Sequence, residues 1–118
     1  AEFIADPLSG RLDPVIETEC FLIAQEALTN IIRHSGATEF RVELRQRDGE
    51  LHLSVQDNGM GFDVQTKREQ AVRGSSLGLL SMAERASLAG GRLEIHSRPG
   101  QGTRLEASFP IKLKLEDK

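Results

Sequence analysis

The sequence has few of the residues that staple a small fold or stack on nucleic-acid bases. Its 118 residues include one cysteine, Cys20, and neither tryptophan nor tyrosine. A single cysteine excludes a disulfide within the chain, and its apolar neighbours predict that Cys20 is a small buried side chain. Aromatic residues make up 4% of the sequence and the formal net charge is -3, which argues against a nucleic-acid groove.

Long apolar runs are also missing. No stretch approaches the roughly 20 apolar residues that are needed to span a bilayer. The start of the sequence lacks the basic, apolar and small-residue pattern of a signal peptide. We therefore expect a cytoplasmic domain, and a longer parent protein could still be anchored in a membrane.

The first third of the sequence predicts a short strand over residues 1–6 and then one long helix. Asp13 and Pro14 form a helix start, with a carboxylate at the N-cap and proline at the first helical position. Helical spacing of apolar residues continues to about His34, and Gly36 can take the left-handed conformation that ends a helix. The apolar face consists of Ile16, Cys20, Ile23, Ala24, Ala27, Leu28 and Ile31.

Alternating apolar residues predict two hairpins, one around Asp48-Gly49 and one around the turn at 99–102. Arg41, Arg45 and Arg47 fall on the polar phase of the first hairpin, where we expect a solvated strand face. The apolar strand positions are Phe40, Val42, Leu44, Leu51, Leu53 and Val55, then Leu93, Ile95, Leu105, Ala107 and Phe109.

The segment between the hairpins reads as a loop followed by a helix. Residues 63–76 are polar and without a period, which predicts a lid or binding loop. Residues 77–89 predict a second helix that Gly90 and Gly91 close. Two hairpins need antiparallel pairing, and the helices must cover one face of the sheet. The sequence therefore predicts a single α+β domain over residues 1–118, a two-layer α/β sandwich.

One group of polar residues lies on the long helix. Glu26, Asn30 and Arg33 or His34 recur every three or four residues, so they share a stripe that borders the apolar face. Glu26 and Asn30 offer oxygen donors, which Mg²⁺ takes together with phosphates and water. Taken alone, such a stripe is more often a solvated helix edge than a metal site.

Two further groups contain glycines. The first, Asp57 to Phe62, follows a strand, and its two glycines allow a close backbone approach to a ligand. The Asp57 carboxylate could accept a hydrogen bond from the amine of adenine, whereas guanine offers a carbonyl there. The second, Gly74 to Leu79, begins a helix, where free N–H groups attract anions and Ser75 or Ser76 could cap. Each is also compatible with an ordinary turn or cap.

In this order, the motifs resemble the nucleotide-binding domain shared by histidine kinases, gyrase B, Hsp90 and MutL (the GHKL or Bergerat fold). The stretch at 25–35, QEALTNIIRHS, resembles the N box of kinases that pair with LuxR/NarL-type response regulators. Residues 57–62 resemble the G1 box, residues 74–79 the G2 box, and Gly102-Thr103 the last turn of the nucleotide site. The resemblance covers about residues 12–110, which would be the core of the domain, and implies an α/β sandwich with a mixed, mostly antiparallel sheet covered on one face by helices.

The resemblance also implies ATP and Mg²⁺ as ligands. Asn30 would ligate Mg²⁺, Glu26 would support the metal or act as general base, and Asp57 would bind the adenine amine with a water held by Thr103. A lid over about residues 63–76 would cover the phosphates. The nucleotide-binding positions that it implies are Asn30, Arg33, His34, Asp57, Gly59, Gly61, Gly74, Ser76, Leu77, Gly78, Leu79 and Thr103.

Two departures from the family pattern bear on function. Ser76 stands where the G2 box usually has glycine, which puts the phosphate end in question but not adenine binding. The family's phosphoacceptor histidine belongs to a separate upstream helical hairpin, and none of His34, His52 and His96 has that context. His52 and His96 fall on the polar phase of strands, where we expect surface histidines that lack a third ligand for zinc.

The resemblance therefore implies the catalytic module of an ATP-dependent protein histidine kinase. Its γ-phosphoryl acceptor would be a histidine on the separate dimerisation and phosphoacceptor domain of the same kinase, for relay to a LuxR/NarL-type response regulator. We expect the isolated chain to be a monomer that binds ATP without autophosphorylation.

Two alternatives stay open. In a GHKL-type ATPase, water would replace histidine as nucleophile, and the ending Arg33-His34-Ser35 of the N box disfavours this. A non-enzymatic interaction module with the same fold is favoured by Ser76, but the intact motif residues speak against it.

Overall fold

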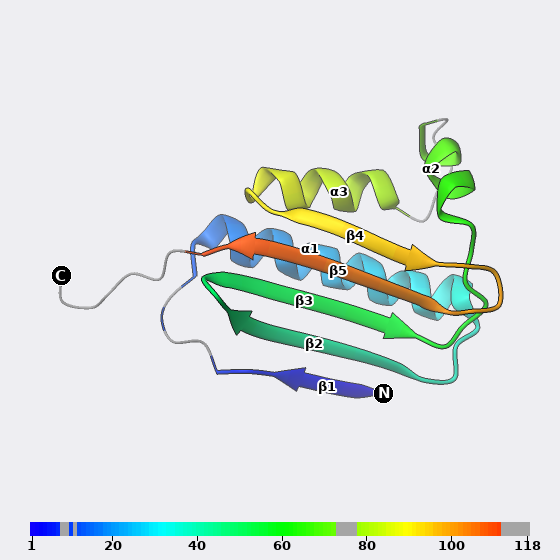
Figure 1. Cartoon of the computed structure of the whole chain (residues 1–118), viewed down its shortest axis with the longest axis horizontal. Helices are drawn as coiled ribbons and strands as arrows, with labels where there is room; N and C mark the ends of the chain where they lie inside the picture. Colours follow the sequence, from blue (N-terminus) through cyan, green and yellow to red (C-terminus); the bar gives the residue numbers. More distant parts are fainter. Residues whose placement is uncertain (8–9, 11, 73–77, 112–118) are drawn as a thin grey trace.

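A computed structural model describes residues 1–7, 10, 12–72 and 78–111 of the chain (Figure 1). The strands are β1 (Glu2–Ala5), β2 (Phe40–Arg47), β3 (Glu50–Asp57), β4 (Arg92–Ser97) and β5 (Thr103–Pro110). The helices are α1 (Pro14–Asn30), which continues into a π-helical turn, η1 (Ile31–Ser35), and then α2 (Val64–Val72) and α3 (Leu79–Leu88). None of these helices has the length and apolar content to cross a membrane.

The five strands form one sheet in the order β1-β2-β3-β5-β4. β1 is parallel to β2, and the remaining neighbours are antiparallel, so the sheet is mixed and mostly antiparallel. Helices α1 and α3 contact each other, and both pack on β5 (Figure 1). The predicted two-layer α/β sandwich is therefore confirmed.

The core lies between this sheet and the two packed helices. Alternate residues of β3 and β5 face the helices, and the predicted apolar positions of both strands are almost fully buried. Burial raises the pKa of the Cys20 thiol to about 11, because the thiolate would lose its hydration. Cys20 is therefore the buried side chain that the sequence predicts. The buried residues from the helices are Ile16, Cys20, Ile23, Ala27, Leu79, Met82 and Ala86.

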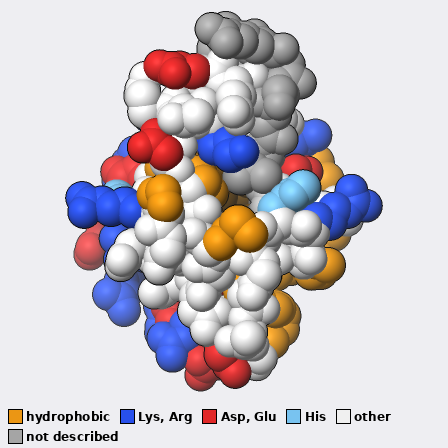
Figure 2. All heavy atoms as spheres, turned by 90° about the vertical axis from the view of Figure 1, so that its right-hand side faces the viewer, with side chains coloured by type: hydrophobic (Ala, Val, Ile, Leu, Met, Phe, Trp, Pro, Cys, Tyr) orange, Lys and Arg blue, Asp and Glu red, His pale blue; other side chains and the backbone are white. Residues whose placement is uncertain are grey.

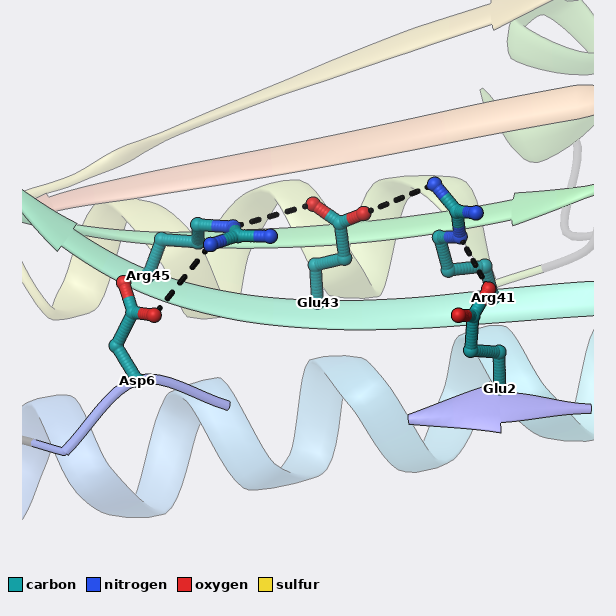
Figure 3. A network of polar contacts seen from close by, with 5 residues as sticks. All are labelled: Glu2, Asp6, Arg41, Glu43 and Arg45. Carbon is teal, nitrogen blue, oxygen red and sulfur yellow. Dashed lines mark hydrogen bonds and ion pairs between the residues drawn. The ribbon is translucent and has the colours of Figure 1, made fainter. Parts of the chain in front are cut away.

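The opposite face of β2 carries charges that tie it to β1 (Figure 3). The guanidinium of Arg41 lies 2.8 Å from Glu2 and 3.2 Å from Glu43. Arg45 lies 3.4 Å from both Glu43 and Asp6. Exposed pairs of this kind contribute little to stability, because water and salt screen them. Arg41 and Arg47 are exposed and Arg45 is half-buried, so these arginines lie on the partly solvated strand face that the sequence predicts.

Both ends of the first helix follow the prediction, with one addition. Asp13 Oδ1 accepts a hydrogen bond from the Val15 amide at 2.7 Å, and Pro14 is the first helical residue. Gly36 ends the helix in the left-handed region, at φ 65°. The addition is the π-helical turn η1, a wider turn that is rare in proteins and often marks functional sites.

The loop predicted over residues 63–76 is wrong in part, because Val64–Val72 forms α2. The start of α2 is capped by Asp63 Oδ1, which accepts a hydrogen bond from the Thr66 amide at 2.8 Å. Glutamine, lysine, arginine, glutamate and alanine are good helix formers. They form no apolar stripe here, so a search for periodicity does not find the helix.

The second predicted helix begins two residues late, at Leu79, after Gly78 at the N-cap. Gly78 has φ 76° and makes no side-chain cap. Residues 73–77, including the predicted capping serines and the G2 positions Gly74, Ser76 and Leu77, lie outside the described residues.

A candidate nucleotide site

A cavity of about 230 Å³ opens at the end of the sandwich where β3 ends and β5 begins. An apolar slot with a few convergent polar groups is typical of small-molecule sites. Figure 2 faces this end of the molecule, where hydrophobic, basic and histidine side chains gather below α2. The apolar lining is Ala27, Ile31, Val55, Met60, Phe62, Leu79, Met82, Ile95 and Leu105. The polar lining is Asn30, His34, Ser35, Asp57, Lys67 and Thr103.

The end of the first helix supplies one wall. Asn30 and His34 both line the cavity, whereas Arg33, which is exposed like His34, is not among its lining residues. Of the two candidates for the phosphates, the fold thus brings His34 to the cavity. Ser35 closes η1, where its hydroxyl donates to the Ile31 carbonyl at 3.0 Å and accepts from the Ala37 amide at 3.0 Å.

Asp57 supplies a buried carboxylate at the end of β3. The residue is 9% exposed, and its Oδ1 accepts a hydrogen bond from the Gly59 amide at 2.7 Å. Burial raises the pKa of Asp57, because a carboxylate loses hydration there, and the Gly59 hydrogen bond opposes the rise. Such a group gains from a ligand that donates a hydrogen bond.

Thr103 lies opposite Asp57 in the register of β3 and β5. The proton of Ser97 Oγ goes to the Gly102 carbonyl at 2.8 Å, so Thr103 Oγ1, at 2.9 Å from Ser97, must be the donor of their shared bond. The same Ser97 hydroxyl accepts from the Phe62 amide at 2.9 Å. Thr103 therefore offers its lone pairs to the site, and both polar groups at this wall are hydrogen-bond acceptors.

The turn after β3 is packed between η1 and the β4–β5 turn. A Cβ at Gly59 would overlap the Ser35 backbone carbonyl, and a Cβ at Gly61 would overlap that of Arg98. The Met60 amide donates to the Ser35 carbonyl at 2.8 Å, and the Gly100 amide donates to the Met60 carbonyl. Gly61 also has φ 64°. Contact therefore requires glycine at both predicted positions, and at Gly61 the left-handed conformation requires it as well.

Glu26 lies one helical turn before Asn30 and contacts the start of α3. A Cβ at Gly78 would lie 2.5 Å from Glu26 Oε2, so the missing side chain makes room for this carboxylate. A carboxylate at a helix N-terminus is favoured by the helix dipole. Glu26 and Asn30 provide the oxygen donors that a Mg²⁺ site uses together with phosphate and water. The residue types therefore fit this ion, and of the two only Asn30 is among the residues that line the cavity.

Sequence reasoning missed three contributors. Lys67 reaches the cavity from α2, a helix that was missed because residues 63–76 were predicted to be a loop. Ser97 orients Thr103 from β4, and Met60 lies between the two glycines of the G1 turn. A helix propensity count over residues 63–72 would have found α2, but no local signal indicates that Ser97 meets Thr103.

A protein-family model described as "Histidine kinase-, DNA gyrase B-, and HSP90-like ATPase" matches residues 16–113. The chain belongs to this family. The sensor protein VraS of Staphylococcus aureus (strain COL) is 46% identical over 96 residues, which are 81% of this chain and 26% of VraS. A sensor-like histidine kinase of Chloroflexus aurantiacus is 42% identical over 86% of this chain and 17% of its own length. The chain thus spans about a quarter or less of these curated relatives.

Solved structures of histidine kinases share the fold of this ATPase-family domain. The histidine kinase domain of a blue-light activated kinase from Erythrobacter litoralis superposes with a TM-score of 0.73 at 21% identity, over 93% of this chain and 50% of that one. The ATP binding domain of PrrB from Mycobacterium tuberculosis gives 0.69 at 24% identity, over 94% and 80%. The predicted fold family is therefore confirmed.

Proposed function

We propose that the cavity binds Mg–ATP and that the domain transfers the γ-phosphoryl group to a histidine on another domain. The observation that carries the proposal is the pair of acceptors, Asp57 and Thr103, at the wall of an apolar slot. The amine of adenine donates where guanine presents a carbonyl. The wall therefore selects ATP over GTP, and the apolar lining takes the flat faces of the base.

The other end of the cavity takes the phosphates. Asn30 and Glu26 would hold Mg²⁺, which when bound neutralises phosphate charge. Lys67 adds a cation from α2, and His34 adds a ring nitrogen from η1. Phosphoryl transfer depends mainly on such positioning and electrostatic stabilisation. The G2 positions Gly74, Ser76 and Leu77, which lie outside the described residues, would complete this end, as the family resemblance implies.

The acceptor would be an imidazole on the dimerisation and phosphoacceptor domain of the same kinase. Its nitrogen attacks the γ-phosphorus, the bond to the β–γ bridging oxygen breaks, and ADP leaves. If Glu26 does not support the metal, its carboxylate would take the imidazole proton as general base. The relay would continue to a response regulator of the LuxR/NarL type, and the domain would act on the cytoplasmic side, with the parent kinase anchored in the membrane.

Calorimetric titration with ATP and GTP in the presence of Mg²⁺ tests the adenine site. In Asp57→Asn, the Gly59 amide still holds the amide oxygen, so an NH₂ group faces the adenine amine. A hydrogen bond to a charged group contributes about 1.5–3 kcal/mol. We therefore expect about 10- to 100-fold weaker ATP binding, and a smaller preference for ATP over GTP.

The matched control is Asp48→Asn, which makes the same chemical change at the opposite end of β3. Asp48 has φ 51°, a conformation that asparagine tolerates. Equal loss of ATP affinity in both variants, or no ATP binding by the folded parent, would contradict the proposed site.

A second test concerns the acceptor. We expect the domain alone to bind ATP as a monomer without incorporating phosphate, because none of its three histidines has the acceptor context. A separately supplied phosphoacceptor domain should be labelled by the parent and not by Asn30→Ala. Phosphate incorporated into the isolated domain, and lost in Asn30→Ala, would refute this. Release of phosphate to water without any acceptor labelling would favour the GHKL-type ATPase.

A further inference from the structure

A cluster of an imidazole and two carboxylates lies on the sheet face that α1 and α3 leave uncovered. Glu94 and His96 come from β4, and Glu106 comes from β5. These residues alternate with Leu93, Ile95 and other core positions, so their side chains project away from the helices. Among the residues that the structure describes, no other three histidine, cysteine or acidic residues meet at metal-ligand spacing.

The distances in the cluster suit a small divalent cation. His96 Nε2 lies 3.4 Å from Glu94 Oε1 and 3.7 Å from Glu106 Oε1, and the three ligand atoms lie within 4.8 Å of one another. With zinc–ligand distances of about 2.0–2.1 Å, two tetrahedral ligands are about 3.4 Å apart. Both pairs that include His96 are therefore close to the spacing that one ion needs, and the two carboxylates, within 4.8 Å of each other, would close on it by side-chain rotation.

The electrostatics of the hairpin also favour a cation. Glu94 and Glu106 are direct partners in the register of β4 and β5, and like charges opposite each other destabilise a strand pair. Arg104 Nε lies 3.7 Å from Glu106 Oε2, the oxygen that does not face His96. Arg104 therefore holds one oxygen of Glu106 and leaves the other for a ligand, while an uncompensated negative charge remains in the cluster.

We propose that Glu94, His96 and Glu106 bind a first-row divalent ion of the Zn²⁺ class, with water in the remaining positions. Zinc accepts both imidazole and carboxylate ligands, whereas Mg²⁺ prefers oxygen ligands alone. The His96 side chain is 50% exposed, so an ion reaches it directly from solvent. The next residue, Ser97, turns to the other face and contacts Thr103. The zinc site and the nucleotide cavity thus lie on opposite faces of one hairpin.

Calorimetric titration of the nucleotide-free protein with ZnCl₂ tests the proposal. We expect one bound ion, with affinity at least about tenfold lower in His96→Gln and in Glu106→Gln, because loss of even an outer-shell partner costs about 10- to 100-fold. The control is His52→Gln. His52 lines the same surface hollow as Glu94 and Glu106, but its ring lies 3.4 Å from Glu50 and 3.2 Å from the Ser108 hydroxyl and forms no ion pair with either proposed ligand. Its substitution should leave Zn²⁺ affinity unchanged.

Amide spectra recorded during the Zn²⁺ titration locate the ion, and they also verify that each variant is folded. Shifts should concentrate at residues 93–97 and 103–107. The proposal is overturned if the folded parent takes up no Zn²⁺, if His96→Gln binds as tightly as the parent, or if the shifts map to residues 26–35. Mg–ATP binding should be the same in His96→Gln and the parent, so this result is independent of the nucleotide site.

Discussion

The packing of the turn after β3 can be tested by adding one methyl group. Gly61 has φ 64°, and a Cβ there would overlap the Arg98 carbonyl oxygen and lie 2.9 Å from the Gly102 carbonyl oxygen. Gly90, at the end of α3, has φ 77° and no atom within 4 Å of its would-be Cβ. Gly61→Ala and Gly90→Ala therefore share the cost of a left-handed alanine, but only the alanine at position 61 would collide with neighbouring backbone.

The shared cost of a left-handed alanine is about 1–2 kcal/mol. Overpacking against backbone that cannot rotate away adds about 1–3 kcal/mol at Gly61 alone. We expect Gly61→Ala to be less stable than Gly90→Ala by that difference. In urea, where the unfolding free energy of a small domain falls by about 1–3 kcal/mol per molar, a 2 kcal/mol difference moves the midpoint by about 1 M.

Urea unfolding followed by circular dichroism gives both midpoints, and calorimetry gives ATP affinity. Gly61→Ala should also bind ATP more weakly, because the displaced turn lines the cavity in which we propose that ATP binds. Gly90→Ala should retain the parent affinity. Equal midpoints for the two variants would refute the packing described for the turn, and retained ATP affinity in a destabilised Gly61→Ala would separate the turn from the nucleotide site.

Three further predictions concern charge, capping and burial. Because burial raises the pKa of Asp57, its charge costs stability above the folded pKa and costs none below the ordinary aspartate value of about 3.9. In urea, Asp57→Asn should therefore unfold at a higher concentration than the parent near neutral pH, and this gain should vanish near about pH 3. A variant less stable than the parent at neutral pH would contradict this. Asp13→Ala removes the hydrogen bond from the Val15 amide and should lower the unfolding free energy by about 1 kcal/mol, whereas Asp13→Asn should not; equal losses in urea unfolding would exclude the cap as the cause. The Cys20 thiol, with its pKa at about 11, should react with a disulfide reagent near about pH 8 only when the domain opens. Saturating Mg–ATP should therefore slow the labelling of Cys20. Labelling at the rate of an unfolded peptide would show that the thiol is accessible in the folded domain.

Several parts of the fold could be predicted from the sequence because their signals are local. The adjacent residues Asp13 and Pro14 specify a helix start, and the adjacent residues Asp48 and Gly49 specify a hairpin turn. Alternation along β3 and β5 fixes which face of each strand is buried, whatever its neighbours are. The helix α2 escaped this reasoning because a polar helix has no apolar period, and its start depends on the Asp63 cap.

The candidate site was predicted as a set of residues and not as an arrangement. The motifs named Glu26, Asn30 and Asp57, since the residue types and their spacing lie within short segments. They did not distinguish Arg33 from His34, because adjacent helical residues point about 100° apart and only packing selects the one that faces the cavity.

The sequence by itself therefore determined which face of each helix or strand is apolar and which functional groups each segment carries. Only the tertiary structure decided which groups meet. The register of β3 with β5 places Thr103 opposite Asp57, and that of β4 with β5 places Glu106 opposite Glu94. Helix packing sets Glu26 against Gly78. These contacts join segments far apart in the chain, and pairing and packing across such distances depend on the whole folded core.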